Sequence, residues 1–415
     1  MTNLDRLIAE FCPDGVEYKN FGKLAKILRG GSPRPISQFI TDSPDGVNWI
    51  KIGDVAPGGK YITSTKEKII RAGMSKSRFV KPGDFVLSNS MSFGRPYIMR
   101  TTGCIHDGWL VLKQDGQKVF DTEFLYYLLS SPYVSNQFDN LAAGSTVRNL
   151  NIALVSSVQV PIPPLPEQKR IVAILDEYFT AIDKVKANAE KNLKNAKELF
   201  DSVLNEQLTI NSEQWEEKKL KDLTTILGDG LHGTPKYTVN GEYYFINGNN
   251  LNDGKIEIKE NTKRVNAGEF VKHKKILNDR TVLVSINGTL GNIAFYNGEK
   301  IILGKSACYF NLKESVDKNF VKYVLSSSYF LRYAHREATG ATIKNVSLKS
   351  MREFRIPFPS LKEQKAIVLR LDALRAETQK LEMVYNKKIA DLEELKKSIL
   401  QRSFAGELTG IGATM

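Results

Sequence analysis

Two glycine-rich segments resemble nucleotide-binding motifs but lack the spacing that nucleotide binding needs. Residues 228–233 (GDGLHG) match the GxGxxG pattern, yet Pro235 follows where the phosphate-binding helix must begin, so a turn is the better interpretation. Residues 304–306 (GKS) resemble the end of a P-loop, but the required earlier glycine is displaced by one position, at Gly298. Neither segment predicts a nucleotide site.

The side chains that could perform catalysis are similarly scattered. Pro13-Asp14 and Glu17-x-Lys19 resemble a nuclease motif, but two intervening residues are too few to bring separate strands to one metal. The chain has no Asn-Pro-Pro-Tyr or Asp-Pro-Pro-Tyr segment, with which an adenine methyltransferase holds its flipped base. No metal-ligand spacing connects the histidines and cysteines, which are His106, His232, His273, His335, Cys12, Cys104 and Cys308. The sequence therefore argues against intrinsic catalysis, a metal site and a directly bound cofactor.

Charge and loop composition instead favour binding to a polyanion. The 415 residues include 59 Lys and Arg against 46 Asp and Glu, a formal net charge of +13. Arg, Lys, Asn and Ser on loops can match the donors and acceptors of base edges. The candidates for DNA contacts in the first half of the chain are Arg34, Lys51, Ser88, Asn89, Ser90, Arg95, Arg148 and Asn149. Those in the second half are Lys236, Asn249, Asn287, Lys305, Lys344 and Asn345.

Alternatives remain open for these residues. A basic protein can be merely soluble, and any one candidate can be a solvated charge or a turn former. Arg148 and Lys344 have more support, because the matching segments 144–149 (GSTVRN) and 340–345 (GATIKN) both place a cation beside Thr and Asn. That trio suits phosphate anchoring more than base recognition. Its alternative role is a helix N-cap.

A second kind of site is predicted where two long helices begin. The same Glu-Gln-Lys triplet opens both helices, as Glu167, Gln168 and Lys169 and as Glu363, Gln364 and Lys365. These residues could dock a partner protein. The alternative is a charged first turn in which glutamate favours the positive end of the helix dipole.

The two triplets belong to an internal duplication. Their offset, 363 − 167 = 196, holds over some eighty residues, through FLYYLLSSPY and FVKYVLSSSY and on to Val203 and Ile399. Upstream the agreement decays to fragments, with residues 31–33 (GSP) over 233–235 (GTP) and 49–50 over 245–246. The predicted units are a domain at 1–160, a spacer helix at 161–208, a second domain at 209–356, a second helix at 357–408 and a tail at 409–415.

Each predicted domain consists mostly of short strands separated by turn signals. VNWIKIGDV, KYITS, GDFVLSNS, PYIMR and GWLVLK are the strand-like runs of the first, and GEYYFING, GKIEIKE, RTVLVSING, NIAFYN and SACYFNL those of the second. FLYYLLSSPYVSNQF, from Phe124, predicts one helix. The fold class is therefore α+β.

The spacer helices carry a coiled-coil pattern. Prolines before Glu167 predict an abrupt helix start there. Apolar residues then recur at alternating spacings of four and three, which predicts a seam between the helices. The first seam is Ile171, Leu175, Tyr178, Ile182, Val185, Ala189, Asn192, Ala196, Leu199 and Val203. The second is Ile367, Leu371, Leu374, Thr378, Leu381, Tyr385, Lys388, Leu392, Leu395 and Ile399.

Helix length predicts how the two helices pair. About forty residues span roughly 60 Å, which is longer than a compact domain of about 150 residues, so the chain returns most easily if the helices are antiparallel. Two similar domains would then be separated by the coiled coil and related by a pseudo-twofold axis. Since their loops differ, such a pair would contact two unlike half-sites on duplex DNA, with unread base pairs between them.

This arrangement resembles the specificity subunit of type I restriction-modification systems. The resemblance rests on the PxPxLxEQ segment at 161–168, its counterpart at 357–364, the Gly-[Ser/Thr]-Pro turns, the WIKIGD segment at 49–54 and the two GxTx[R/K]N segments. It implies two target-recognition domains on conserved helices, along which two modification subunits pack. Those subunits methylate adenine with S-adenosylmethionine, and restriction subunits add ATP-driven, Mg-dependent translocation and cleavage. The second domain departs from the first by having NGNN at 247–250 where the first has KIGD at 51–54.

Other hypotheses fit less of the sequence. A stand-alone nuclease or methyltransferase needs a catalytic constellation, and a protein-binding scaffold leaves the basic charge unexplained. A DNA-recognition subunit for a modification-only or non-type-I adenine methyltransferase is the nearer alternative. The sequence has no apolar run of membrane-spanning length and no uninterrupted apolar core of a signal peptide, so we expect a cytoplasmic protein.

Overall fold

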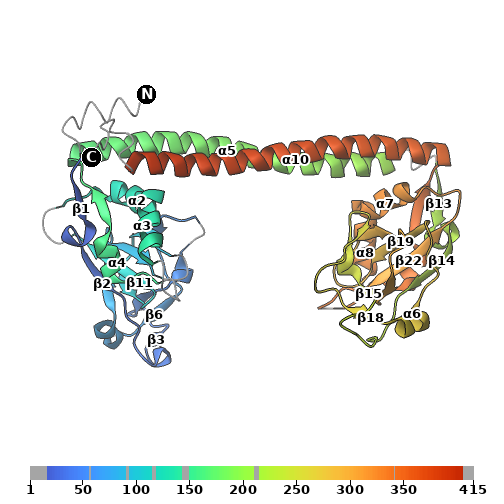
Figure 1. Ribbon diagram of the computed structural model, residues 1–415, viewed down its shortest axis with the longest axis horizontal. Coiled ribbons are helices and arrows are strands. Elements are labelled where there is room, and N and C mark those ends of the chain that lie inside the picture. Colours follow the sequence, from blue (N-terminus) through green and yellow to red (C-terminus); the bar gives the residue numbers. More distant parts are fainter. Residues whose placement is uncertain are drawn as a thin grey trace. The chain divides into compact units, whose positions relative to one another are not determined.

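The computed structural model describes residues 16–55, 58–89, 93–114, 118–142, 149–209, 215–340 and 342–404. The chain divides into two compact units, Met1–Asn188 with Lys388–Met415, and Ala189–Lys387. Two long helices, α5 (Leu165–Thr209) and α10 (Leu361–Phe404), each contribute one part to each unit (Figure 1). Within the described residues, no helix is both long and apolar enough to span a membrane.

The domain of the first unit contains two five-stranded sheets and a separate strand pair. The sheet orders are β3-β6-β4-β10-β7 and β2-β11-β8-β9-β5, and β1 pairs with β12. The strands are β1 (Tyr18–Asn20), β2 (Lys26–Arg29), β3 (Ile40–Thr41), β4 (Val47–Ile50), β5 (Tyr61–Ile62), β6 (Glu67–Ile69), β7 (Arg78–Val80), β8 (Phe85–Ser88), β9 (Pro96–Met99), β10 (Gly103–Ile105), β11 (Trp109–Lys113) and β12 (Gln159–Pro161). The shorter helices are α2 (Thr122–Ser130), α3 (Pro132–Ala142) and α4 (Ile152–Ser157).

The second unit repeats this plan with fewer strands. Its sheets have the orders β14-β22-β19-β20 and β18-β15-β21, with pairs β13-β23 and β16-β17. The strands are β13 (Glu216–Lys219), β14 (Thr224–Asp229), β15 (Tyr243–Ile246), β16 (Leu251–Asn252), β17 (Lys255–Ile256), β18 (Arg264–Val265), β19 (Thr281–Ser285), β20 (Ile293–Phe295), β21 (Ile301–Leu303), β22 (Ala307–Leu312) and β23 (Arg355–Phe358). The helices are α6 (Ala267–His273), α7 (Lys318–Ser326), α8 (Ser328–Glu337) and α9 (Leu348–Glu353).

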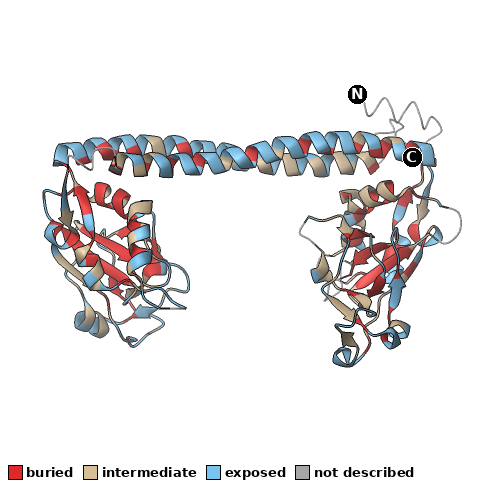
Figure 2. Ribbon diagram, turned by 180° about the vertical axis from the view of Figure 1, so that it is seen from behind, coloured by how far each residue is buried: buried red, intermediate tan, exposed pale blue. Residues whose placement is uncertain are grey.

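The central strands are buried on both faces, because helices cover one face and the second sheet covers the other (Figure 2). In β8 and β11 alternate side chains separate into two cores, as the two-residue period of a strand requires. Leu87, Leu110 and Leu112 pack with the helices. Val86, Trp109 and Val111 pack with the second sheet. The α+β class and the duplicated domain predicted from sequence are confirmed, and the duplication extends through the strands.

The predicted helix from Phe124 is two helices. Asp121 caps α2, its carboxylate accepting hydrogen bonds from the backbone N–H groups of Glu123 and Phe124. Pro132 follows Ser131 and has no N–H with which to continue the α2 hydrogen-bond series, so α2 stops and Pro132 becomes the first residue of α3. The second unit breaks its α7–α8 helix pair at the corresponding Ser327.

The long helices pack antiparallel in each unit. In the first unit Asp183 pairs with Lys396 and Lys186 with Glu393, so the numbering of α10 falls as that of α5 rises. In the second unit the Arg375 guanidinium lies 4.9 Å from the ring centroid of Phe200. The predicted antiparallel coiled coil is confirmed. Helix α5 begins at Leu165, two residues earlier than predicted, because Pro166 lies in the first turn, where its missing N–H leaves no bond unmade.

Each predicted heptad has two apolar positions facing the seam. One of them is confirmed, and the other is displaced by one residue. Leu175, Ile182, Ala189 and Ala196 are buried as predicted, but Tyr178, Val185 and Leu199 are exposed, and their neighbours Phe179, Lys186 and Phe200 are covered instead. In α10 the exposed Leu381 and Leu395 lie next to the more covered Glu382 and Lys396. The reason is that each helix also packs against its domain, where Phe179 contacts Tyr127 and Phe200 contacts Tyr323 at ring-centroid distances of 5.5 and 6.1 Å. The polar seam residues Asn192 and Lys388 are exposed as well.

Candidate nucleic-acid interface

An equivalent turn in each unit lies at the centre of the candidate interface. In the first unit residues 106–108 connect β10 to β11, and in the second residues 304–306 connect β21 to β22. The Asn89 N–H donates to the carbonyl of Gly108 at 3.0 Å, and the Ile286 N–H donates to the carbonyl of Ser306, also at 3.0 Å. These matching bonds place Asp107 and Lys305 at the same structural position. The same backbone framework therefore carries an acidic side chain in the first unit and a basic side chain in the second.

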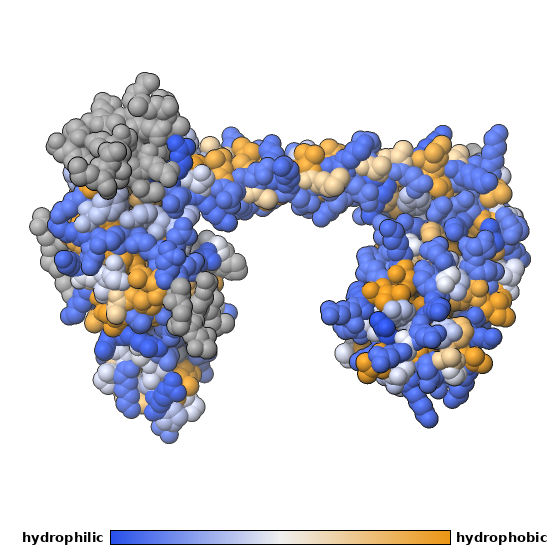
Figure 3. Space-filling view, viewed as in Figure 1, coloured by the Kyte–Doolittle hydropathy of each residue, from blue (hydrophilic) through white to orange (hydrophobic). Residues whose placement is uncertain are grey.

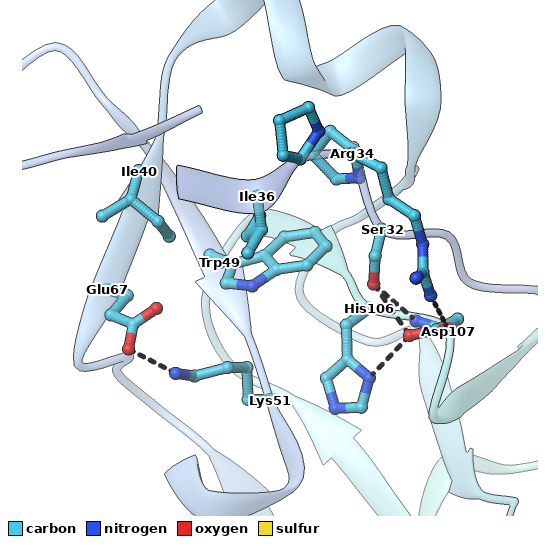
Figure 4. A pocket seen from close by; sticks show the side chains of 11 residues that line it. Ser32, Arg34, Ile36, Ile40, Trp49, Lys51, Glu67, His106 and Asp107 are labelled. Carbon is cyan, nitrogen blue, oxygen red and sulfur yellow. Dashed lines mark hydrogen bonds and ion pairs between the residues drawn. The ribbon is translucent and has the colours of Figure 1, made fainter. Parts of the chain in front are cut away.

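The turn in the first unit opens onto a pocket of about 880 Å³ (Figure 4). Its lining residues are Ser32, Pro33, Arg34, Pro35, Ile36, Ile40, Trp49, Lys51, Glu67, His106 and Asp107. Two predicted DNA-contact residues, Arg34 and Lys51, are thereby brought together. The Ser32 hydroxyl donates to the Asp107 carboxylate at 2.7 Å, and the Arg34 guanidinium lies 3.5 Å from the same carboxylate. Lys51 forms an ion pair with Glu67, which lies beside it in the pocket lining.

Arg34 is the most accessible charged side chain of this pocket that forms an ion pair. Its side chain is 82% exposed, although the ion pair with Asp107 restrains it. An exposed ion pair of this kind contributes little to stability. The pair can therefore hold a guanidinium at the mouth of the pocket and still release it to the two acceptors of a guanine edge.

The surroundings of His106 favour its neutral form. The backbone N–H groups of Ile52 and Gly108 approach its two ring nitrogens at 3.2 and 2.7 Å. A neutral imidazole can accept one of these N–H groups at its unprotonated nitrogen, whereas an imidazolium can accept neither. Burial lowers the pKa of His106, outweighing the opposite effect of Asp107. The hydrogen bond from Ser32 lowers the pKa of the Asp107 carboxyl. The turn thus presents a neutral ring beside a fixed negative charge.

A pocket beside the equivalent turn of the second unit has a different lining, and the positions it shares with the first pocket are those of Ser32 and His232 and of Asp107 and Lys305. It measures about 410 Å³ and is lined by Asp229, His232, Ile286, Asn287, Lys305, Asn345, Val346, Ser347 and Leu348. Three predicted DNA-contact residues, Asn287, Lys305 and Asn345, meet here. The Asn287 side-chain amide donates to the Asn345 side-chain oxygen at 3.0 Å. His232 lies 2.6 Å from the Asp229 carboxylate, which leaves Lys305 exposed and without a hydrogen-bond or ion-pair partner in the described part of the chain.

Residues 51–54 (KIGD) and 247–250 (NGNN) have similar backbone conformations in the two units and differ in their side chains. Lys51 and Asn247 each precede a 3₁₀ turn, η3 (Ile52–Asp54) and η6 (Gly248–Asn250). The Lys51 N–H donates to the Asp54 carboxylate at 2.8 Å, and the Asn247 N–H donates to the Asn250 side-chain oxygen at 3.0 Å. One unit therefore presents a lysine and the other an asparagine from the same turn.

The remaining DNA-contact candidates are placed less centrally. Arg95 is exposed, with its guanidinium 5.5 Å from the ring centroid of Tyr97. Lys236, Asn249 and Lys344 are exposed and line neither pocket. Ser88 and Asn89 are buried: Asn89 donates to the Asp107 carbonyl at 2.8 Å and supports the turn, whereas the Ser88 hydroxyl accepts from the Arg95 N–H at 3.2 Å. Asn149 is half-buried, and Ser90 and Arg148 lie outside the described residues.

Sequence reasoning missed several residues of both pockets. Trp49, Glu67, His106 and Asp107 in the first, and Asp229 and His232 in the second, were not among the candidates. The internal repeat could have revealed these residues, but the predicted alignment of the two halves upstream of the helices was wrong. The Gly31 N–H donates to the Ile105 carbonyl and the Leu231 N–H to the Leu303 carbonyl, so Gly31 corresponds to Leu231 and not to Gly233.

The two glutamines of the Glu-Gln-Lys triplets have an internal role. Gln168 is fully buried; its side-chain oxygen accepts from the Asp121 N–H at 2.7 Å, and its amide donates to the carbonyls of Val119 and Pro163, both at 2.9 Å. Gln364 repeats this contact, accepting from the Asp317 N–H at 2.8 Å. Both amides are occupied within the chain, so we remove the two glutamines from the predicted partner-docking set.

The other members of the triplets differ in exposure. Lys169, Glu363 and Lys365 are exposed and remain candidates for partner docking. Glu167 is buried, and desolvation raises the pKa of its carboxyl. Glu363 instead caps its own helix, accepting from the Ser360 N–H at 2.9 Å.

Comparison with known proteins identifies the family. The profile described as Type I restriction modification DNA specificity domain matches residues 13–195 and again 212–391. The chain belongs to this family. It is 26% identical to the putative type I restriction enzyme MjaX specificity subunit of Methanocaldococcus jannaschii, covering 95% of this chain and 94% of that protein. It is 24% identical to the EcoKI specificity subunit of Escherichia coli strain K12, covering 96% and 90%.

Solved structures of type I systems share the fold. One chain, from a study of complex assembly and conformational transition of the type I R-M system, aligns with a TM-score of 0.71 at 19% identity over 94% of this chain and 98% of its own length. The HsdS subunit of Thermoanaerobacter tengcongensis aligns with a TM-score of 0.56, also at 19% identity, over 95% and 98%. The doubled family match agrees with the two units described above, so the resemblance inferred from sequence is confirmed.

Proposed function

We propose that this member of the type I specificity family is a non-catalytic subunit that recognises a bipartite, asymmetric site on double-stranded DNA. Each domain contacts one half-site. The observation that carries the proposal is the equivalent turn of the two units, because the same scaffold places Asp107 beside Arg34 in the first unit and Lys305 in a pocket with Asn287 and Asn345 in the second. Similar frameworks with unlike polar groups suit two half-sites of unlike sequence.

The chemistry of each pocket favours a different base edge. Arginine and lysine pair with the O6 and N7 acceptors of guanine, whereas asparagine pairs with the donor and acceptor of adenine. Arg34 and Lys51 therefore favour guanine in the first half-site. In the second unit, Asn287 and Asn345 add amides that can contact adenine beside the Lys305 ammonium.

The long helices provide the surface for partner proteins. On α10 the side chains of Leu369, Met383 and Val384 are 72, 66 and 58% exposed, and apolar patches are visible along the helix pair (Figure 3). Contiguous exposed apolar surface, as at the neighbouring Met383 and Val384, is typical of protein contact sites. We assign to these helices the docking of two modification subunits and of restriction subunits. S-adenosylmethionine, ATP and Mg would then bind to those partners.

The test is methylome sequencing of a methylation-free host that expresses this chain with the modification subunit encoded beside it. The expected result is methylated adenine in one bipartite motif with a fixed unspecified spacer. Methylation in a short continuous motif, or none despite a stable, assembled complex, would contradict the proposal.

A further inference from the structure

A second surface repeats in both units, next to the pockets but not part of them. In each unit an exposed apolar side chain lies in a segment rich in lysine and arginine. Phe79 in the first unit is 44% exposed, and Ile276 in the second is 71% exposed. The two residues are equivalent in three dimensions. Lys113 on β11 donates to the Phe79 carbonyl at 3.1 Å, and Asn311 on β22 donates to the Ile276 carbonyl at 3.0 Å.

The chain after each residue confirms the equivalence. The Asp84 N–H donates to the Lys81 carbonyl, and the Thr281 N–H donates to the Asn278 carbonyl, both at 3.0 Å. The offsets agree, since 278 − 81 = 197 and 276 − 79 = 197. The pairing of an exposed apolar residue with a preceding cation, Arg78 or Lys275, is therefore a repeated feature of the scaffold.

The cations around these side chains are not neutralised. Around Phe79 they are Arg71, Lys76 and Arg78, and around Ile276 they are Lys272, Lys274 and Lys275. In the part of the chain that the structure describes, none of the six forms an ion pair with an acid. The Lys76 ammonium lies 4.9 Å from the ring centroid of Phe39, and that of Lys275 lies 6.0 Å from Tyr309. Each apolar side chain therefore lies in a segment whose cations form no ion pair among the described residues.

Both surfaces adjoin the candidate interface. The Ser77 hydroxyl donates to the carbonyl of Ile105, the residue before the turn in the first unit, at 2.8 Å. In the second unit Tyr309, under Lys275, also packs against Gly228, which precedes Asp229 of the pocket. A ligand that occupies either pocket and extends along the domain would meet these residues next.

We propose that Phe79 and Ile276 are apolar contacts to the DNA groove or sugar edge, held there by phosphates bound to the cations beside them. This proposal rests on the proposed function. Duplex DNA fits because it presents dense negative charge at its rim and apolar sugar and base surfaces in its grooves. The contact is insensitive to sequence, so the same scaffold can use it at both half-sites while the pockets differ.

The test uses the full chain assembled with its modification subunits and a duplex that carries the methylated motif. Ile276→Ser and Phe79→Ser are each expected to weaken binding on the order of tenfold, equally for matched and half-site-mismatched duplexes. The matched controls are Val239→Ser, 91% exposed, and Ile152→Ser, 42% exposed, which are expected to bind like the wild type. The double variant Lys272→Ala with Lys274→Ala is expected to reduce the slope of log affinity against log salt by about two.

Each outcome decides the proposal. Unchanged affinity and salt slope in the variants, with tight wild-type binding, would overturn this inference and leave the proposed function intact. Loss of modification subunits from the Ile276→Ser complex on gel filtration would show that the surface binds protein, and would also overturn it. A wild-type complex that does not prefer the motif duplex would refute the proposed function itself.

Discussion

The turn at residues 106–108 and its equivalent at 304–306 have the same backbone surroundings and opposite charge. In the first unit Asp107 accepts from Ser32 and restrains Arg34, whereas in the second Lys305 shares its pocket with two asparagines and has no ion-pair partner among the described residues. The difference shows how one fold can be used twice. The strands, the turn and the buried glutamines are kept, while the polar residues at the turn are exchanged.

The largest effect is expected where the two units are most alike. Replacing Gln168 or Gln364 with Ala removes a buried amide and leaves a backbone N–H and two carbonyls unsatisfied, at a cost of about 2–3 kcal/mol in the stability of that unit. The two variants should be destabilised equally, as measured by urea unfolding. Lys169→Ala is the control, with almost no change expected. Clearly unequal effects of the two glutamines would contradict their structural equivalence.

Substitutions in the two pockets, by contrast, should each affect only one half-site. Arg34→Ala is expected to lower discrimination at the first half-site by about 1–3 kcal/mol, and Lys305→Ala to do the same only at the second. Competition binding with duplexes mismatched in one half-site measures both effects. Lys23→Ala, an exposed lysine that is neither a pocket residue nor a predicted DNA contact, is the control. If either variant relaxed both half-sites together, the two pockets would not act separately.

A smaller effect is expected where each domain meets its helix. The Tyr127 hydroxyl donates to Asp176 and the Tyr323 hydroxyl donates to Asp372, and in both cases burial and the carboxylate raise the tyrosine pKa. Tyr127→Phe and Tyr323→Phe should each cost about 1 kcal/mol of stability. Thermal unfolding checks this result. A loss in only one variant would show that the two domains are anchored differently.

The smallest expected effect is a pH dependence of stability in the first unit. Because burial lowers the pKa of His106 in the folded chain from its ordinary value of 6.5, its neutral form stabilises the first unit above that pH. The stability should fall as pH drops below about 6.5, since the unfolded chain takes up the proton more readily. Trp49 and Trp109 report on the first unit once Trp215→Phe removes the third tryptophan. His106→Gln should flatten the profile, and an unchanged profile would contradict the neutral assignment.

Much of the architecture could be predicted because it follows from local pattern. Alternating apolar residues located the main strands, prolines located the start of α5 to within two residues, and the offset of 196 revealed the duplication. The heptad phase could not be predicted, because Tyr178 and Phe179 are both apolar and only contact with the domain decides which one is buried.

The candidate site was predicted only in part. Arg34, Lys51, Asn287, Lys305 and Asn345 are residue types that suit base edges, and the structure gathers them into two pockets. Asp107 and His106 were missed because their position follows from the parallel pairing of β4 with β10, strands more than fifty residues apart. The burial of Gln168 is likewise fixed by a loop 47 residues upstream.

The most direct test of the central claim exchanges one domain. Residues 16–160 are replaced by the same region of a relative with a known, different target, and the methylome of a host expressing the chimera with its modification subunit is sequenced. We predict that one half-site of the motif changes while the other half-site and the spacer stay the same. A motif that changes in both half-sites together would contradict the claim that each unit recognises its own half of the target.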